Sequence, residues 1–139
     1  MSMNKMYRDY IFIIGCGHSG TTLLNKIIGN HMNVLGFNYE TKLFLSDDQN
    51  TIKKLDEYEQ KRKYREKKYI VEKTPVHVYC IDKMYKYIKN PKIIVMVRDG
   101  RDAICSLKKR YGSFKKAKNR WINDNFEWIR SKYCKKLGH

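Results

Sequence analysis

The sequence lacks any long apolar run. Near the N-terminus its longest apolar stretch covers only residues 10–14, whereas a membrane-spanning helix needs about 20 consecutive apolar residues. The same stretch is too short for the apolar core of a secretory signal peptide, and no small-residue cleavage site follows it. We therefore expect no membrane span and no cleaved leader, and we expect the chain to be cytoplasmic.

Closely spaced cysteines are also absent. The four cysteines are widely scattered, and no two of them are separated by only two residues, which is the spacing at which zinc sites usually place their ligands. We therefore predict no metal site. The cysteines are expected to be reduced, partly buried thiols: Cys16, Cys80, Cys105 and Cys134.

Acidic residues are few relative to basic ones. The chain has 14 Asp and Glu against 30 Lys and Arg, which gives a formal net charge of +16. Residues 108–139 alone hold 11 Lys or Arg against Asp124 and Glu127, a net charge of +9. Such a surface favours polyanionic partners, including nucleic acid, anionic lipid, phosphorylated cofactors and acidic peptides. The charge by itself does not choose among them.

What is present is an alternation of strand-like and helix-like segments, with no internal repeat or low-complexity linker. Residues 10–14 and 92–97 are apolar runs typical of buried parallel strands, and residues 34–36 and 69–71 are shorter strand candidates. We predict one compact domain over residues 1–139, of the three-layer α/β/α class, with a central parallel sheet of about four strands. The expected helices cover residues 21–29, one or two segments of 42–68, residues 77–88, a segment from 100 or 101 onward, and residues 116–136.

A glycine-rich turn follows the first strong strand. Residues 15–22 read GCGHSGTT, and such a turn directs successive backbone N–H groups and a helix N-terminus toward one anion. The glycine spacing matches a P-loop, but Thr21 stands where a nucleotide triphosphatase would have its lysine. The loop is therefore predicted to hold a phosphate group without hydrolysing ATP.

A second polar turn follows the other strong strand. Arg98 closes that strand, and its guanidinium can bind a phosphate in bidentate fashion. Ser106 lies about two turns into the next helix, so its hydroxyl reaches the same edge only if the helix folds back over the sheet. Because ligands of parallel sheets bind beyond the carboxyl ends of the strands, we expect both turns to form one site.

Three segments together resemble the sulfotransferases. IFIIGCGHSGTTLL is similar to their phosphosulfate-binding loop, IIVMVRDGRDAICSL to their 3′-phosphate motif, and VEKTP to a lysine-bearing strand end between them. The resemblance implies a P-loop sulfotransferase fold, 3′-phosphoadenosine 5′-phosphosulfate as donor, the 3′,5′-bisphosphate nucleotide as product, and no metal. The chain stops before the C-terminal part of the family domain, so it resembles a minimal or C-terminally truncated member. The implied donor-binding residues are Gly17, His18, Ser19, Gly20, Thr21, Thr22, Arg98 and Ser106.

The motifs are closest to those of the tyrosylprotein sulfotransferases, and this likeness implies catalytic roles. GFNYETK, residues 36–42, is similar to a stretch in which a glutamate takes the acceptor's proton, which assigns the general base to Glu40. Lys73 and His18 would stabilise charge on the leaving group, with His18 standing where the family has Lys or Arg. His77 is a rival base. Trp121 matches a family tryptophan, although core packing is its expected role.

The acceptor stays open at this point. A protein tyrosine in an acidic peptide suits the basic surface, and a carbohydrate hydroxyl is chemically equivalent. Two other functions are considered: a P-loop kinase or NTPase, which lacks its lysine here, and a non-catalytic nucleic-acid-binding domain that uses the basic helices. No nucleic-acid fold signature is present, so this last function is the least favoured.

Overall fold

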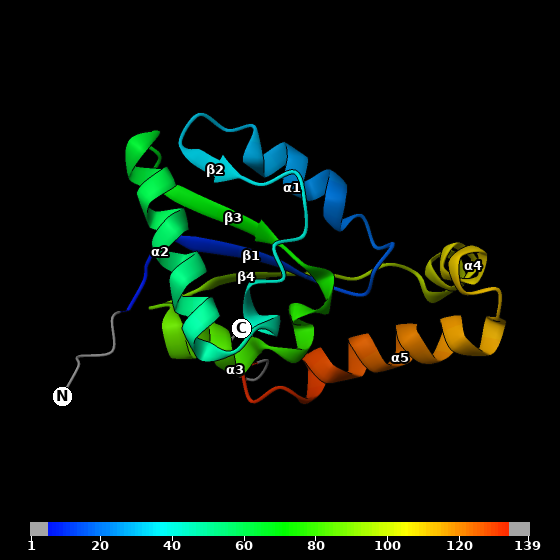
Figure 1. Ribbon diagram of the computed structural model, residues 1–139. Coiled ribbons are helices and arrows are strands. Elements are labelled where there is room, and N and C mark those ends of the chain that lie inside the picture. Colours follow the sequence, from blue (N-terminus) through cyan, green and yellow to red (C-terminus); the bar gives the residue numbers. More distant parts are fainter. Residues whose placement is uncertain (1–5, 134–139) are drawn as a thin grey trace.

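The computed structural model describes residues 6–133, whose strands form one parallel sheet (Figure 1). The strands are β1 (Tyr10–Gly15), β2 (Val34–Gly36), β3 (Tyr69–Lys73) and β4 (Lys92–Met96), in the order β2-β3-β1-β4. All three pairings are parallel, with Phe12 of β1 opposite Glu72 and Ile93. The predicted four-stranded parallel sheet and its strand positions are confirmed.

The described residues also form five α-helices and two 3₁₀ turns, of which the last two α-helices follow the final strand. The predicted segment 42–68 contains one long helix, which begins after Asp47 because that carboxylate accepts the N–H of Asn50. The predicted helix 77–88 is instead a 3₁₀ turn that begins at Pro75, followed by a short α-helix. The elements are α1 (Thr21–Gly29), η1 (Leu43–Leu45), α2 (Asp48–Tyr64), η2 (Pro75–Tyr79), α3 (Ile81–Tyr87), α4 (Gly100–Tyr111) and α5 (Phe114–Arg130).

The last helix differs from its predicted bounds. It begins at Phe114 rather than at 116, because the Ser113 hydroxyl accepts the N–H of Lys116 and caps the first turn. It ends at Arg130. Residues 131–133 of the predicted segment form a bend and turn rather than helix, and residues 134–136 lie outside the described residues, as does Cys134.

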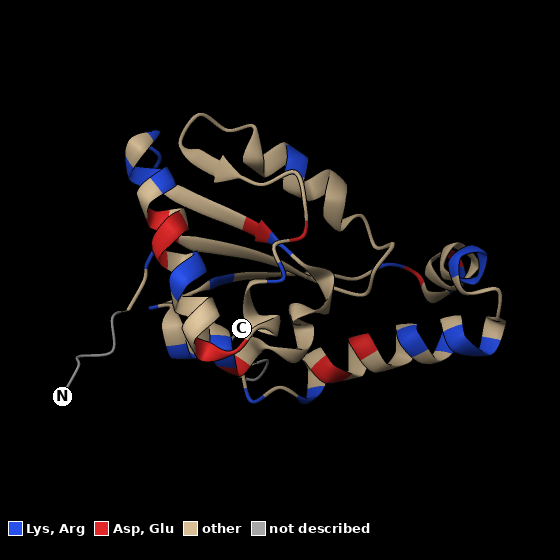
Figure 2. Ribbon diagram, viewed as in Figure 1, with Lys and Arg blue, Asp and Glu red and all other residues tan. Residues whose placement is uncertain are grey.

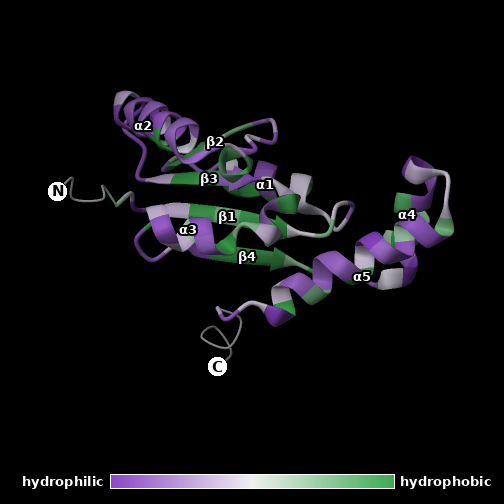
Figure 3. Cartoon of the chain, turned by 60° about the horizontal axis from the view of Figure 1, so that its bottom comes forward, coloured by the Kyte–Doolittle hydropathy of each residue, from purple (hydrophilic) through white to green (hydrophobic). Residues whose placement is uncertain are grey.

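Alternating side chains of the strands divide the core between the two faces of the sheet. Tyr10, Phe12 and Ile14 of β1 pack with residues of η1, α2 and α3, whereas Ile13 packs on the opposite face with residues of α1 such as Leu24. This is the expected three-layer arrangement, because period-two side chains of a parallel sheet must be covered on both sides. Figure 3 shows the hydrophobic strands between helices that are largely hydrophilic.

Helices α4 and α5 lie at the carboxyl end of the sheet (Figure 1). They pack against each other through Leu107 and Ala117, in a small core that includes Cys16 from the turn after β1. Figure 2 shows Lys and Arg gathered on α4 and on the first half of α5. None of the helices within residues 6–133 has the length and hydropathy of a membrane span.

Candidate active site

The turn after β1 has the backbone of an anion-binding loop. Gly15 adopts φ +131°, and a Cβ there would lie 2.5 Å from the carbonyl oxygen of Met96, so no larger residue fits. Gly20 adopts φ +88° and is the N-cap of α1, where no side chain caps the helix. The first N–H groups of α1 are therefore left for a ligand at the positive end of the helix dipole.

The loop contains a buried hydroxyl without a partner and a glycine with open space beside it. Ser19 is 5% exposed, and its Oγ has no hydrogen-bond partner among the described residues. Buried polar atoms in proteins are nearly always hydrogen-bonded. Gly17 has no neighbour within 4 Å of where a Cβ would stand, so its backbone is open to a ligand. Ser19 does not line the cavity described below, so the open space for an anion in this loop lies at Gly17.

The two predicted halves of the donor site meet at His18. Arg98 donates from Nη1 to the carbonyl oxygen of His18 over 3.0 Å, and the Oγ of Ser106 lies 2.8 Å from His18 Nδ1. Ser106 thus reaches the turn after β1, although α4 packs on α5 beyond the strand ends and does not fold back over the sheet (Figure 1). A cavity of about 550 Å³ lies here. It is lined by Gly17, His18, Gly20, Thr21, Thr22, Arg98 and Ser106, together with Glu40.

Two cations in the cavity wall were missed from the sequence. Lys26 lies four residues after Thr22 on α1, and Arg110 lies four residues after Ser106 on α4. Residues four apart share one face of a helix, so this spacing was the available signal. Both add positive charge to a site that already presents helix N–H groups and Arg98.

Helix α5 holds the end of β4 in place. The indole Nε1 of Trp121 donates to the carbonyl oxygen of Arg98 over 3.3 Å, and a Cβ on Gly100 would come within 3.0 Å of the same ring. Trp121 thus packs as expected and also contacts the backbone of Arg98, a predicted donor-binding residue. Asp99 caps α4. Its carboxylate accepts hydrogen bonds from the guanidinium of Arg101, which has the larger effect, and from the backbone N–H of Arg101, and these bonds lower the pKa of the carboxyl to about 2.

Helix α5 also reaches the turn after β1 through a buried acid. Asp124 is fully buried and accepts from the hydroxyl of Tyr79 at 2.7 Å and from Nε of Arg120 at 2.5 Å. Burial, with Asp124 nearby, raises the pKa of the Cys16 thiol to about 12. Cys16, Cys80 and Cys105 are free thiols, as predicted, with Cys16 buried and Cys105 exposed.

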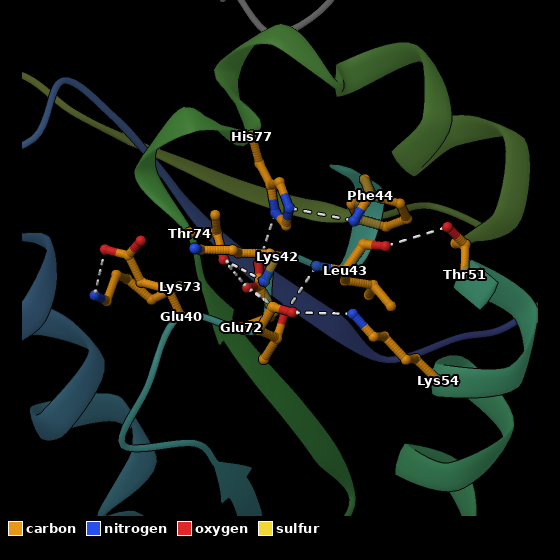
Figure 4. Close-up of polar contacts among 11 residues, drawn as sticks. Glu40, Lys42, Leu43, Phe44, Thr51, Lys54, Glu72, Lys73, Thr74 and His77 are labelled. Atoms are coloured by element: carbon orange, nitrogen blue, oxygen red, sulfur yellow. Dashed lines mark hydrogen bonds and ion pairs between the residues drawn. The ribbon is translucent and has the colours of Figure 1, made fainter. Parts of the chain in front are cut away.

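The predicted base and the predicted lysine form an ion pair. Lys73 ends β3, and its Nζ lies 3.2 Å from Oε1 of Glu40, which comes from the loop after β2 (Figure 4). The Lys73 side chain is 9% exposed and that of Glu40 is 42% exposed. The carboxylate of Glu40 therefore lines the cavity, whereas Lys73 contacts that carboxylate from within the protein.

His77, the rival base, is enclosed. Its ring is fully buried; Nε2 accepts the N–H of Phe44 over 3.2 Å, and Nδ1 lies 3.0 Å from Oε2 of Glu72. Because Nε2 accepts, the ring proton is on Nδ1 and is donated to Glu72. Neither nitrogen is open to an acceptor, so the structure argues against His77 as the base. Glu72 itself was missed, although a glutamate in an otherwise apolar strand was visible in the sequence.

Metal-ligating side chains do not cluster in the described part of the chain. Across residues 6–133, no three His, Cys, Asp or Glu side chains are placed to hold one ion. The candidate site instead consists of backbone N–H groups, hydroxyls, cations and one carboxylate. Such groups can bind a phosphorylated ligand and move a proton.

Comparison with known proteins points to one family. The model of the family described as "Sulfotransferase family" matches residues 46–137, a range that includes Lys73, Arg98 and Ser106 but not the turn after β1. A search of curated proteins finds no match.

Two solved structures share the fold, and both are described as sulfotransferase domains. One is from the olefin synthase of Synechococcus PCC 7002, with a TM-score of 0.70, 14% identity and 99% of this chain covered. The other is from the curacin biosynthetic pathway, with a TM-score of 0.73, 16% identity and 96% of this chain covered. The chain spans 65% of the length of each.

Proposed function

Because the chain belongs to the sulfotransferase family, we propose that it transfers a sulfuryl group from 3′-phosphoadenosine 5′-phosphosulfate to a hydroxyl group of an acceptor. One observation carries the proposal. The loop after β1 and the Arg98–Ser106 pair meet at His18, in the same cavity that Glu40 lines. A site for both phosphate-bearing ends of a nucleotide and a candidate base thus occupy one place.

The donor is held by two groups of residues. The N–H groups at the start of α1 and the hydroxyls of Ser19, Thr21 and Thr22 receive the 5′ end, while Arg98 and Ser106 receive the 3′-phosphate. The donor, when bound, supplies an activated sulfuryl group and a phosphate leaving group. The uncapped N-terminus of α1 and the open space at Gly17 support this assignment.

Glu40 and Lys73 have separate roles, one in proton transfer and the other in charge stabilisation. Glu40 takes the proton from the acceptor hydroxyl as the oxygen attacks. Lys73 moves its ammonium from Glu40 toward the negative charge that grows on the leaving oxygen. Their 3.2 Å contact supports the proposal, because it places the ammonium of Lys73 beside the carboxylate that lines the cavity.

His18 joins the two halves of the donor site. Its ring contacts Ser106 and its carbonyl oxygen accepts from Arg98. When protonated, the ring adds a positive charge to the loop, at the position where the family has Lys or Arg. We therefore propose that His18 supports both donor binding and charge stabilisation.

The acceptor we propose is a protein tyrosine in an acidic segment or a carbohydrate hydroxyl. The basic surface of α4 and α5 supports an anionic acceptor. We further propose that residues 1–139 act as one compact unit in the cytoplasm.

A transfer assay tests the proposal. Donor carrying ³⁵S in its sulfuryl group is incubated with the chain and, in separate reactions, with an acidic tyrosine peptide or an oligosaccharide. Label should move to one acceptor class with wild-type protein and not with Arg98→Ala. ATP labelled in its γ-phosphate serves as the control, and transfer of that label instead would favour a kinase and contradict the proposal.

A further inference from the structure

A buried carboxylate lies directly behind the candidate active site. Glu72 of β3 is fully buried and directly precedes Lys73 in the chain. Its Oε1 accepts from the hydroxyls of Thr41 at 2.7 Å and Thr74 at 2.5 Å, and its Oε2 lies 3.0 Å from Nδ1 of His77 (Figure 4). A buried carboxylate is costly unless it is hydrogen-bonded in this way.

Each of these three partners also receives one N–H group of the loop that follows Glu40. The N–H of Lys42 donates to Thr74 Oγ1 over 3.1 Å, and the N–H of Leu43 donates to Thr41 Oγ1 over 3.2 Å. The N–H of Phe44 donates to His77 Nε2 over 3.2 Å. Three consecutive backbone groups are therefore tied to Glu72, each through a single intermediate side chain.

The loop needs such support because its backbone is in a conformation that side chains disfavour. Lys42 adopts φ +52°, in the left-handed region. Residues of this kind persist where the surrounding contacts determine the conformation, and they gather at functional sites. On one side of the turn Thr41 points inward, 6% exposed, while Glu40 remains open to the cavity.

Two neighbouring contacts thus join the loop to the end of β3. Thr41 follows Glu40, and Glu72 precedes Lys73, so the buried Thr41–Glu72 hydrogen bond lies beside the partly buried Glu40–Lys73 ion pair. We propose that Glu72 is the positioning residue of this site: through Thr41, Thr74 and His77 it fixes the loop so that Glu40 meets Lys73. Glu72 does not touch the reacting atoms. Only the expected effect of Glu72 on kcat rests on the proposed function; the positioning of Glu40 does not.

The charge of Glu72 matters as well as its shape. Its oxygens accept three hydrogens, from two hydroxyls and one ring nitrogen. A glutamine has one oxygen acceptor and presents an NH₂ group instead of the second, so one donor would face another donor. The ring of His77 cannot resolve this by moving its proton to Nε2, because that atom accepts the N–H of Phe44.

Thr41 gives the sharpest test, because it can be changed without removing a buried charge. Thr41→Val keeps the shape and removes the hydroxyl, Thr41→Ser keeps the hydroxyl, and Thr51→Val is the matched control. Thr51 is also a buried threonine, and it donates to the carbonyl oxygen of Leu43 without contacting Glu72. A misplacement of about 1 Å at a reacting group can cost about 10²-fold in rate.

The expected result is a loss of turnover with donor affinity retained. In Thr41→Val, kcat should fall by about 10-fold to 10²-fold, while the dissociation constant of the bisphosphate nucleotide stays within about twofold of wild type, because the loop after β1 is untouched. Thr41→Ser should restore most of kcat, and Glu72→Gln should resemble Thr41→Val. Equal kcat in Thr41→Val and Thr51→Val would overturn the inference.

A second measurement separates this inference from the proposed function. The ¹³C shift of the Glu40 carboxyl is recorded by NMR with and without Lys73→Met, first in wild type and then in Thr41→Val. The shift difference should be clear in wild type and greatly reduced in Thr41→Val, whether or not the chain transfers sulfate. An undiminished difference would show that Glu40 meets Lys73 without the help of Glu72, and would overturn the positioning role even in an active enzyme.

Discussion

The ammonium of Lys73 and the carboxylate of Glu40 lie 3.2 Å apart, although 33 residues separate them in the chain. The contact joins the end of β3 to the loop that follows β2. Strands β2 and β3 are neighbours in the sheet. It lies beside the cavity formed by the loop after β1 and by α4. The pair therefore links the predicted proton acceptor to the predicted charge-stabilising residue before any ligand is bound.

Separate changes to this pair should act on turnover. Glu40→Gln keeps the shape of the side chain but removes the base, so kcat should fall by about 10²- to 10⁴-fold with the affinity for the bisphosphate nucleotide unchanged. Lys73→Met should also act mainly on kcat, because its charge matters most as the bond to the leaving group breaks. Steady-state kinetics combined with calorimetry make the distinction. A Glu40→Gln enzyme with wild-type kcat would remove Glu40 from the mechanism.

Trp121 should influence donor binding through the backbone of Arg98. Trp121→Phe keeps an aromatic ring against Gly100 but removes the indole hydrogen bond to the Arg98 carbonyl oxygen. One hydrogen bond of this kind corresponds to roughly a 3- to 10-fold loss of affinity for the bisphosphate nucleotide. Trp128→Phe, on the same helix but packed against the main core, is the control. Equal effects of the two substitutions would mean that the Trp121 hydrogen bond does not position Arg98.

The four strands and the two polar turns that line the candidate site could be predicted because their signals are local. Each strong strand is an apolar run that ends at a glycine-bearing turn, and parallel topology brings such ends to one edge. Arg98 and His18 therefore meet as expected, although they are 80 positions apart in the chain.

Other parts of the site depend on contacts that no local pattern encodes. The position of Glu72 in its strand does not indicate which residues it contacts, because its partner Thr41 lies 31 residues away in the chain. Asp124 similarly looks like a solvated helix residue beside Arg120, yet it is fully buried against Tyr79. The burial of His77 likewise depends on the folding of η1 over its ring, because Phe44 of η1 packs edge-on against it.

Cysteine chemistry gives a test of how α5 packs on the turn after β1. Since the pKa of Cys16 is raised to about 12 by burial beside Asp124, its thiol should stay protonated and unreactive at pH 8, whereas exposed Cys105 should be alkylated by iodoacetamide. Mass spectrometry of the digested protein identifies the modified residue. Modification of Cys16 at the rate of Cys105 in folded protein would contradict the packing.

The same thiol predicts how stability depends on alkaline pH. Its ordinary pKa is 9.0 and its pKa in the folded chain is about 12. Between these values the folded chain retains a proton that the unfolded chain has lost, so stability should fall as the pH rises from 9 toward 12. Cys16→Ala should reduce this slope in thermal unfolding measured across the same pH range. An unchanged slope would assign the alkaline loss to other groups.

The basic face of α4 and α5 should act on the rate of association. Charge reversal at Lys115, Lys116 and Lys118, all exposed, should slow binding of the bisphosphate nucleotide by about 10-fold at low ionic strength, and the difference should nearly vanish near 1 M salt. Stopped-flow measurements at both ionic strengths test this. The control is reversal at Lys63, Lys68 and Lys89, which are exposed near the amino ends of the strands. A slowing that is independent of salt, or equal in the control, would rule out electrostatic steering.

The most direct test of the central claim is the affinity for a nucleotide with and without its 3′-phosphate. Calorimetry of the full chain should show 3′-phosphoadenosine 5′-phosphate binding more tightly than AMP, because Arg98 and Ser106 line the same cavity as the N-terminus of α1. Arg98→Ala should remove most of that preference while leaving the affinity for AMP nearly unchanged. Equal affinity of the wild-type chain for the two nucleotides would contradict the assignment of the 3′-phosphate site, and with it the proposed donor.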